Sequence, residues 1–115
     1  MSSTTAFKNL LLDASDINTL SLHSGDPGGS GTSNEVSGGG YTRQSCTFAA
    51  AASGEKALSA AVNFTTLASQ SVTYLGFWAS STFRGSRQLS GDTSANAIGQ
   101  YQVTTATKLT LADVA

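Results

Sequence analysis

The sequence predicts a mainly β protein, namely an antiparallel β-sandwich or jelly-roll-like domain with a short N-terminal helix. About six runs of alternating apolar and polar residues follow one another at a spacing of roughly ten residues, which is typical of these folds. Ser and Thr together make up 33 of the 115 residues, and 12 more are Gly. Ser and Thr disfavour helix interiors and Thr suits pleated surfaces, so the composition also favours strands and turns. A small barrel would show the same alternation, and the strand order therefore stays open.

Length and charge predict one domain, residues 1–115, and exclude several classes of function. A chain of this length with 39% hydrophobic residues can bury one modest core. Six Lys and Arg against seven Asp and Glu leave a net charge of -1 without a basic cluster, so we expect no nucleic-acid partner. No apolar run approaches the length of a membrane span, and we expect no membrane partner. One Cys and one His exclude an intramolecular disulfide and a Cys/His zinc site.

The first predicted element is the short N-terminal helix. Phe7, Leu10 and Leu11 have helical spacing and follow possible capping residues at positions 3–5. This spacing predicts only two or three helical turns, because the apolar periodicity then changes.

A strand is predicted over residues 17–23, followed by a long loop over residues 24–40. In the strand, Leu20 and Leu22 alternate with polar residues. The loop is almost entirely Gly, Ser, Thr, Asn and acidic residues, and Pro27 favours a turn within it. Because a loop of this length is uncommon in a small domain, we expect it to be either a contact surface or poorly ordered.

Further strands are predicted along the rest of the chain. Residues 41–48 alternate without a clean apolar face, so their register is weakly determined. After a turn at 53–56, residues 58–66 place four side chains on one side: Leu58, Ala60, Val62 and Phe64. Residues 71–81 carry apolar groups on both sides, which predicts a central strand. Strands over 83–89 and 98–111 complete the set.

His23 is the residue that could support nucleophilic catalysis. A Ser-His-Asp hydrolase would need a Ser brought to this His by the fold, and no Gly-x-Ser-x-Gly motif marks such a Ser. With 18 Ser in the chain, one lying near His23 by chance is expected. We therefore predict an ordinary surface or loop His and no enzymatic activity, with a small hydrolase as a third hypothesis.

Three acidic residues, Asp16, Asp26 and Glu35, could supply oxygen ligands to Ca²⁺. The alternating acids of an EF-hand loop are absent, and Asp26 precedes Pro27 in a turn-forming segment. We predict solvated loop acids, with no metal and no cofactor.

Arg84 and Arg87 lie beside Phe83 and a few residues after Trp78. Such a group could hold a carboxylate or a partner surface, and the alternative is a pair of solvated arginines beside core aromatics. Cys46 is predicted to be a small buried or half-buried side chain.

Several segments resemble small virion proteins of tailed bacteriophages, which are often labelled tail-fibre or minor structural proteins. The resemblance begins with Leu20-Ser-Leu-His-Ser-Gly-Asp-Pro-Gly28 and Asn34-Glu-Val-Ser-Gly-Gly-Gly-Tyr-Thr-Arg-Gln44. It continues through Ala-Ala-Val-Asn-Phe at 60–64, Val72-Thr-Tyr-Leu-Gly-Phe-Trp78, Leu89-Ser-Gly91 and Leu109-Thr-Leu111. It thus spans most of the chain, from about residue 11 to residue 111.

The resemblance implies a non-enzymatic structural component of the virion, made in the cytoplasm of the bacterial host. We favour a capsid decoration (cement) protein on the outer capsid surface, because a short sequence without repeats predicts one globule and not a fibre shaft. The alternative is a tail-associated fibre or receptor-binding module. Expected partners are the major capsid protein or other virion proteins and further copies of the chain, with a trimer favoured. Predicted contacts are the short N-terminal segment and these residues: Asp26, Pro27, Glu35, Tyr41, Arg43, Trp78, Arg84 and Arg87.

Overall fold

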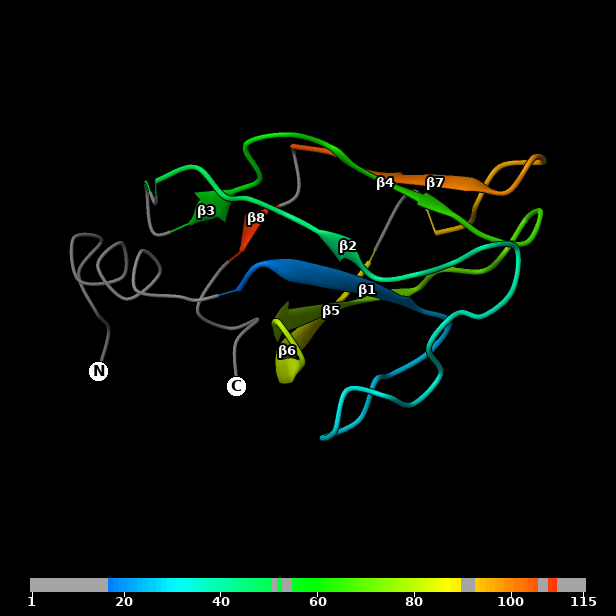
Figure 1. Ribbon diagram of the computed structural model, residues 1–115, viewed down its shortest axis with the longest axis horizontal. Coiled ribbons are helices and arrows are strands. Elements are labelled where there is room, and N and C mark those ends of the chain that lie inside the picture. The colour runs from blue at the N-terminus through cyan, green and yellow to red at the C-terminus, as the bar shows by residue number, and fades with distance from the viewer. Residues whose placement is uncertain (1–16, 51, 53–54, 90–92, 106–107, 110–115) are drawn as a thin grey trace.

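The chain forms short antiparallel strands (Figure 1). The computed structural model describes residues 17–50, 52, 55–89, 93–105 and 108–109. The strands are β1 (Thr19–His23), β2 (Gln44–Ser45), β3 (Lys56–Ala57), β4 (Val62–Thr65), β5 (Tyr74–Ala79), β6 (Thr82–Gln88), β7 (Gln100–Val103) and β8 (Lys108–Leu109). The described residues contain no helix, which confirms a mainly β protein, and the predicted helix around Phe7 lies outside them. Consequently, no membrane-spanning helix is found in this part of the chain.

Four strands form one antiparallel sheet in the order β2-β1-β5-β6, and the other four form two ribbons, β3–β8 and β4–β7. Figure 1 shows the β4–β7 ribbon lying to one side of the sheet. The antiparallel arrangement is as predicted. A complete sandwich or jelly roll stays a prediction, because the described strands facing the sheet are paired only two by two.

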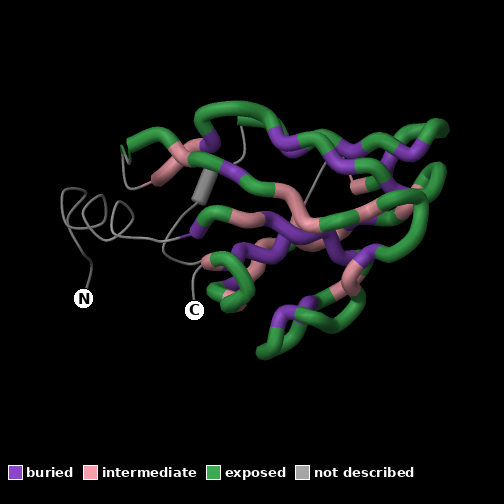
Figure 2. Tube along the Cα trace, in the orientation of Figure 1, coloured by how far each residue is buried: buried purple, intermediate pink, exposed green. Residues whose placement is uncertain are grey.

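The core lies between the sheet and the β4–β7 ribbon. Leu20 and Leu22 of β1 and Leu75 and Phe77 of β5 are each at most 1% exposed, and they belong to one cluster with the inward residues of the ribbon. Those inward residues are Val62, Phe64, Tyr101 and Val103. Figure 2 shows buried residues along β1 and β5 and alternating along the ribbon. Alternation with period 2 therefore sets the burial of the ribbon, as the sequence predicts.

β1 and β5 are the two central strands, and both of their faces are covered. β1 pairs with β5 from Thr19↔Trp78 to His23↔Tyr74, so Ser21 lies opposite Gly76. This confirms the central position predicted for residues 71–81. On the face away from the core, β1 carries Ser21 and His23, which are both 0% exposed.

Three predicted segments differ from the observed strands. Within 41–48 only Gln44–Ser45 is a strand, followed by a bridge between Phe48 and Leu58, because this segment has no apolar face to hold a longer register. The predicted run 98–111 divides into β7 and β8, which pair with different partners. Ala60 is exposed, since the chain bends at 59–60 before β4 begins, so the prediction that it shares a side with the core residues is wrong.

The loop over residues 24–40 folds back on β1. The amide of Val36 donates to Leu22 O at 2.9 Å, and the amide of Ser24 donates to Asn34 O at 2.9 Å. Gly31 is buried at φ 76°, and a Cβ there would overlap the ring of Phe83 on β6. The loop therefore covers the outer face of the sheet, so the segment predicted as a contact surface is also part of the fold.

Replacing Gly76 by Ala should destabilise the protein by about 1–3 kcal/mol, because the added methyl would overlap Ser21 Oγ in a filled space. The free energy of unfolding from urea denaturation measures the effect. Gly29→Ala is the matched control, since a Cβ at Gly29 meets nothing within 4 Å, and we expect it to change stability by less than about 0.5 kcal/mol. Equal effects of the two substitutions would contradict the close approach at Gly76.

Candidate functional site

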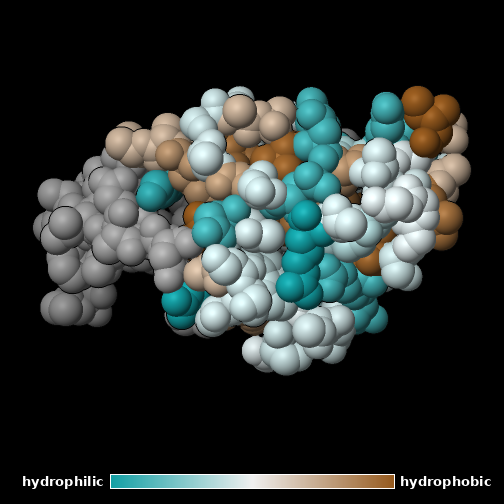
Figure 3. All heavy atoms as spheres, viewed as in Figure 1, coloured by the Kyte–Doolittle hydropathy of each residue, from teal (hydrophilic) through white to brown (hydrophobic). Residues whose placement is uncertain are grey.

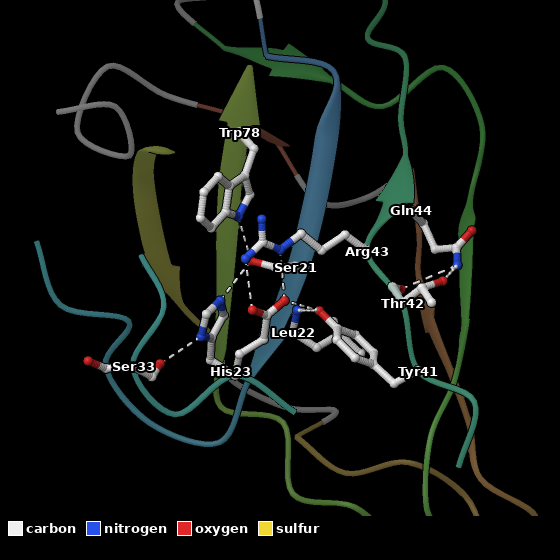
Figure 4. A network of polar contacts seen from close by, with 10 residues as sticks. Ser21, Leu22, His23, Ser33, Tyr41, Thr42, Arg43, Gln44 and Trp78 are labelled. Atoms are coloured by element: carbon white, nitrogen blue, oxygen red, sulfur yellow. Dashed lines mark hydrogen bonds and ion pairs between the residues drawn. The ribbon is translucent and has the colours of Figure 1, made fainter. Parts of the chain in front are cut away.

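A chain of polar contacts covers the outer face of β1 and β5 and joins it to the loop (Figure 4). Trp78 Nε1 lies 2.8 Å from Ser21 Oγ, and Ser21 Oγ lies 2.7 Å from His23 Nε2. His23 Nδ1 lies 2.9 Å from the carbonyl oxygen of Ser33 in the loop. Ser21 and His23 point the same way because they are two residues apart on one strand. Trp78 lies on the same face because it is two residues from Gly76, the partner of Ser21.

The partners of His23 define the direction of each hydrogen bond in this series of contacts. The Ser33 carbonyl can only accept, so His23 Nδ1 carries the proton and donates. A neutral imidazole then has an accepting Nε2, to which Ser21 donates its hydroxyl proton. Trp78 Nε1–H donates to the same Ser21 oxygen. All three side chains are thus satisfied when His23 is neutral.

A second cluster lies beside the first and centres on Glu35. Its Oε2 accepts from Arg43 Nε and from Tyr41 OH, both at 2.9 Å, and its Oε1 accepts from Arg43 Nη2 at 2.9 Å. Tyr41 OH also accepts the amide proton of Leu22 at 2.9 Å, so the cluster is tied to β1. The Arg43 guanidinium lies 3.7 Å from the centre of the Trp78 ring, a cation–π contact that joins the two clusters.

Burial and pairing shift the pKa values of these groups in different directions. Burial by itself would raise the pKa of Glu35, but hydrogen bonds from Arg43 and Tyr41 outweigh it and hold that pKa below its ordinary value. The hydrogen bonds to Glu35 raise the pKa of Arg43, and burial raises the pKa of Tyr41. The ion pair is therefore kept charged over a wide pH range.

His23 shows the opposite balance. Burial lowers its pKa, and this effect exceeds the opposing influence of the Ser33 carbonyl and of Glu35. Arg43 lowers the pKa further. The site thus favours the neutral imidazole that the hydrogen-bond directions require, and the prediction of an ordinary surface or loop His is wrong.

Ser21 Oγ and His23 Nε2 are as close as a catalytic nucleophile and its general base, but both groups are packed inside the protein. Both residues are 0% exposed, so no substrate can reach Ser21 Oγ in this conformation. The group on His23 Nδ1 is a backbone carbonyl and not the carboxylate of a catalytic triad. What this arrangement does is fasten the loop to the sheet.

The structure brings together four of the predicted contact residues, Glu35, Tyr41, Arg43 and Trp78, and pairs them with one another. Pro27 is buried, and Asp26 is exposed with its Oδ1 accepting the amide proton of Gly28 at 2.9 Å. Arg84 and Arg87 lie on β6, exposed and half-buried respectively.

Cys46 is buried, as predicted, and its burial raises the pKa of the thiol to about 11. Ser21 and Gly76 were not predicted as members of the site. Their signals are a Ser-x-His pattern on one strand and a Gly inside an apolar strand, which marks a close approach.

Ser21→Ala should lower the free energy of unfolding by roughly 2–4 kcal/mol, because Trp78 Nε1 and His23 Nε2 both lose a buried partner at about 1–3 kcal/mol each. Ser24→Ala is the control, since that Ser is exposed and its hydroxyl lies 3.4 Å from its acceptor. Urea denaturation compares the two. A Ser21→Ala protein as stable as the Ser24→Ala protein would refute the bridging role.

The stability of the protein should fall as the pH drops below about 6.5. His23, the sole His of the chain, has a lower pKa in the folded state than its ordinary 6.5, so the unfolded chain takes up the proton first. Its contribution is complete above pH 6.5 and is lost toward the folded pKa, while protonation of Glu35 adds a further loss at lower pH.

The free energy of unfolding between pH 7.5 and pH 5 tests this dependence. The His23→Gln variant should lose most of the slope between pH 7 and pH 5.5, whatever its stability at pH 7.5. A wild-type protein with no slope in that interval would show that His23 has the same pKa in both states.

Comparison with known proteins agrees with the resemblance noted in the sequence. The family model described as podophage GP4 fiber I protein gp80 matches residues 6–113. Searches of curated proteins and of solved structures gave no match. Because the family match covers nearly the whole sequence, the chain belongs to the podophage GP4 fiber I protein gp80 family, a family of tailed-phage virion structural proteins.

Proposed function

We propose that this chain is a non-enzymatic structural component of a podophage fibre. The observation that carries the proposal is the family match over residues 6–113, because the family description names a fibre protein. A structural role in the virion follows from family membership itself. The family description therefore favours a location in a fibre, whereas the sequence by itself favoured the capsid surface.

The geometry of the candidate site supports a role without catalysis. The Ser21–His23 pair is enclosed, and each of its polar atoms is engaged in holding the loop against the sheet. A loop fixed at Ser33, Glu35 and Val36 presents its exposed residues in one arrangement. Such pre-organisation reduces the entropy lost when a surface is buried in an assembly.

Contacts with other virion proteins and with further copies of the chain, in a trimer, are part of the proposal. Asp26 and Arg84 are exposed and remain the best candidates among the predicted contact residues. Repetition by symmetry would strengthen a small contact in the assembled particle.

Capsid decoration is the second candidate function. It is favoured by the lack of internal repeats in these 115 residues, because repetition is typical of an extended shaft. A decoration protein would use the same kind of contact surface on a different lattice.

A cryo-EM reconstruction of the intact virion separates the two candidates. The head is averaged with icosahedral symmetry and the tail is averaged separately, and the chain is located by fitting its four-stranded sheet. We expect density in a fibre on the tail. Density on the capsid lattice would replace the fibre proposal with decoration, and a chain missing from purified particles would contradict both.

A further inference from the structure

An open groove of about 700 Å³ lies beside the β4–β7 ribbon, apart from the Ser21–His23 and Glu35 clusters. Its polar lining includes Gln44, Asn63, Asn96, Gln100 and Gln102. Figure 3 shows hydrophilic residues interspersed with weakly polar and hydrophobic ones in the region of β2, β4 and β7. The volume is in the usual range of small-ligand sites, about 300–1,000 Å³.

The groove is lined by side-chain amides. Hydrogen bonds within the fold hold these amides in place. Gln102 Nε2 donates to Asn63 Oδ1 across the ribbon at 3.0 Å, and Gln44 Nε2 donates to Thr42 Oγ1 at 3.0 Å. Asn96 Oδ1 accepts the amide proton of Gln100 at 2.9 Å, which fixes the turn that leads into β7. Among the described residues, these contacts leave Gln44 Oε1, Asn63 Nδ2, Gln102 Oε1 and Gln100 Nε2 open to a ligand.

The chemistry of this lining selects for an uncharged ligand. The described residues of the groove include no Asp, Glu, Lys, Arg or His. A bound phosphate, carboxylate or ammonium group would find no opposite charge to replace its lost hydration. The open amide atoms offer two donors and two acceptors, which matches hydroxyl groups, because each hydroxyl both donates and accepts.

We propose that this groove binds a neutral saccharide. The carbonyl oxygens of Gln44 and Gln102 accept from sugar hydroxyls, and the amino groups of Asn63 and Gln100 donate to them. Phe64 and Tyr101 also line the groove, but they are only 2% and 5% exposed and belong to the core, so recognition of the sugar rests on the amides. The inference deepens the proposed function, on which its biological setting rests, by giving a virion protein a ligand of stated chemistry.

The test uses the purified full chain and needs no virion. The ¹⁵N-labelled protein is titrated with neutral oligosaccharides of hexoses and N-acetylhexosamines and with matching oligosaccharides that carry uronic or sialic acid. The side-chain amide signals of Gln44, Asn63, Gln100 and Gln102 report binding directly. An uncharged peptide of Ser, Thr and Gln is the competing probe.

We expect a neutral oligosaccharide to shift these four signals in a saturable way, with no shift caused by the acidic counterparts. Gln100→Glu should weaken binding by about tenfold, the effect of losing one hydrogen bond, while it keeps an oxygen for Asn96 Nδ2. Gln88→Glu, which makes the same change of charge on exposed β6, should bind as the wild type does.

Three results would overturn the assignment. They are the absence of any shift with the neutral oligosaccharides, equal binding by Gln100→Glu and Gln88→Glu, and shifts caused by the peptide in place of the sugars. Because the virion reconstruction measures only location, a failure of the saccharide proposal would be separate from a failure of the fibre proposal.

Discussion

The buried polar atoms on the outer face of β1 must each have a hydrogen-bond partner, and the rest of the structure depends on this constraint. A strand with both faces covered cannot leave a hydroxyl or an imidazole without a partner, because each such group costs free energy when it loses water. Ser21 meets this requirement for His23 and Trp78 together, and Gly76 provides the space for it. The loop then completes the set by supplying the Ser33 carbonyl.

The charged residues near this face are also paired. Glu35 of the covering loop pairs with Arg43, which follows the loop, so the two charges are neutralised where they meet the sheet. Arg43 also packs on Trp78, which lets one guanidinium serve an ion pair and an aromatic contact. The β4–β7 ribbon differs, because its exposed side carries amides and hydroxyls and no charged group. Two surfaces with different chemistry therefore lie on one small chain.

Sequence patterns predicted the strands better than their contacts. Alternation at Leu20 and Leu22 and the doubly apolar run around Gly76 identified β1 and the central β5, because side-chain period is a local property. The contact between Ser21 and Trp78 joins residues 57 positions apart, which no local pattern encodes. The ion pair between Glu35 and Arg43 was likewise not predicted, because it depends on how the loop folds back.

The pairing of β1 with β5 also has a consequence for the order of folding. β1 is the second strand of the sheet, yet its long partner begins at Tyr74, after β2, β3 and β4 have been synthesised. Contacts between residues so far apart slow folding, because the intervening chain must close into a loop first. On the ribosome, Ser21 and His23 would remain hydrated until Trp78 leaves the exit tunnel, so the buried polar contacts of β1 form only after β5 has emerged.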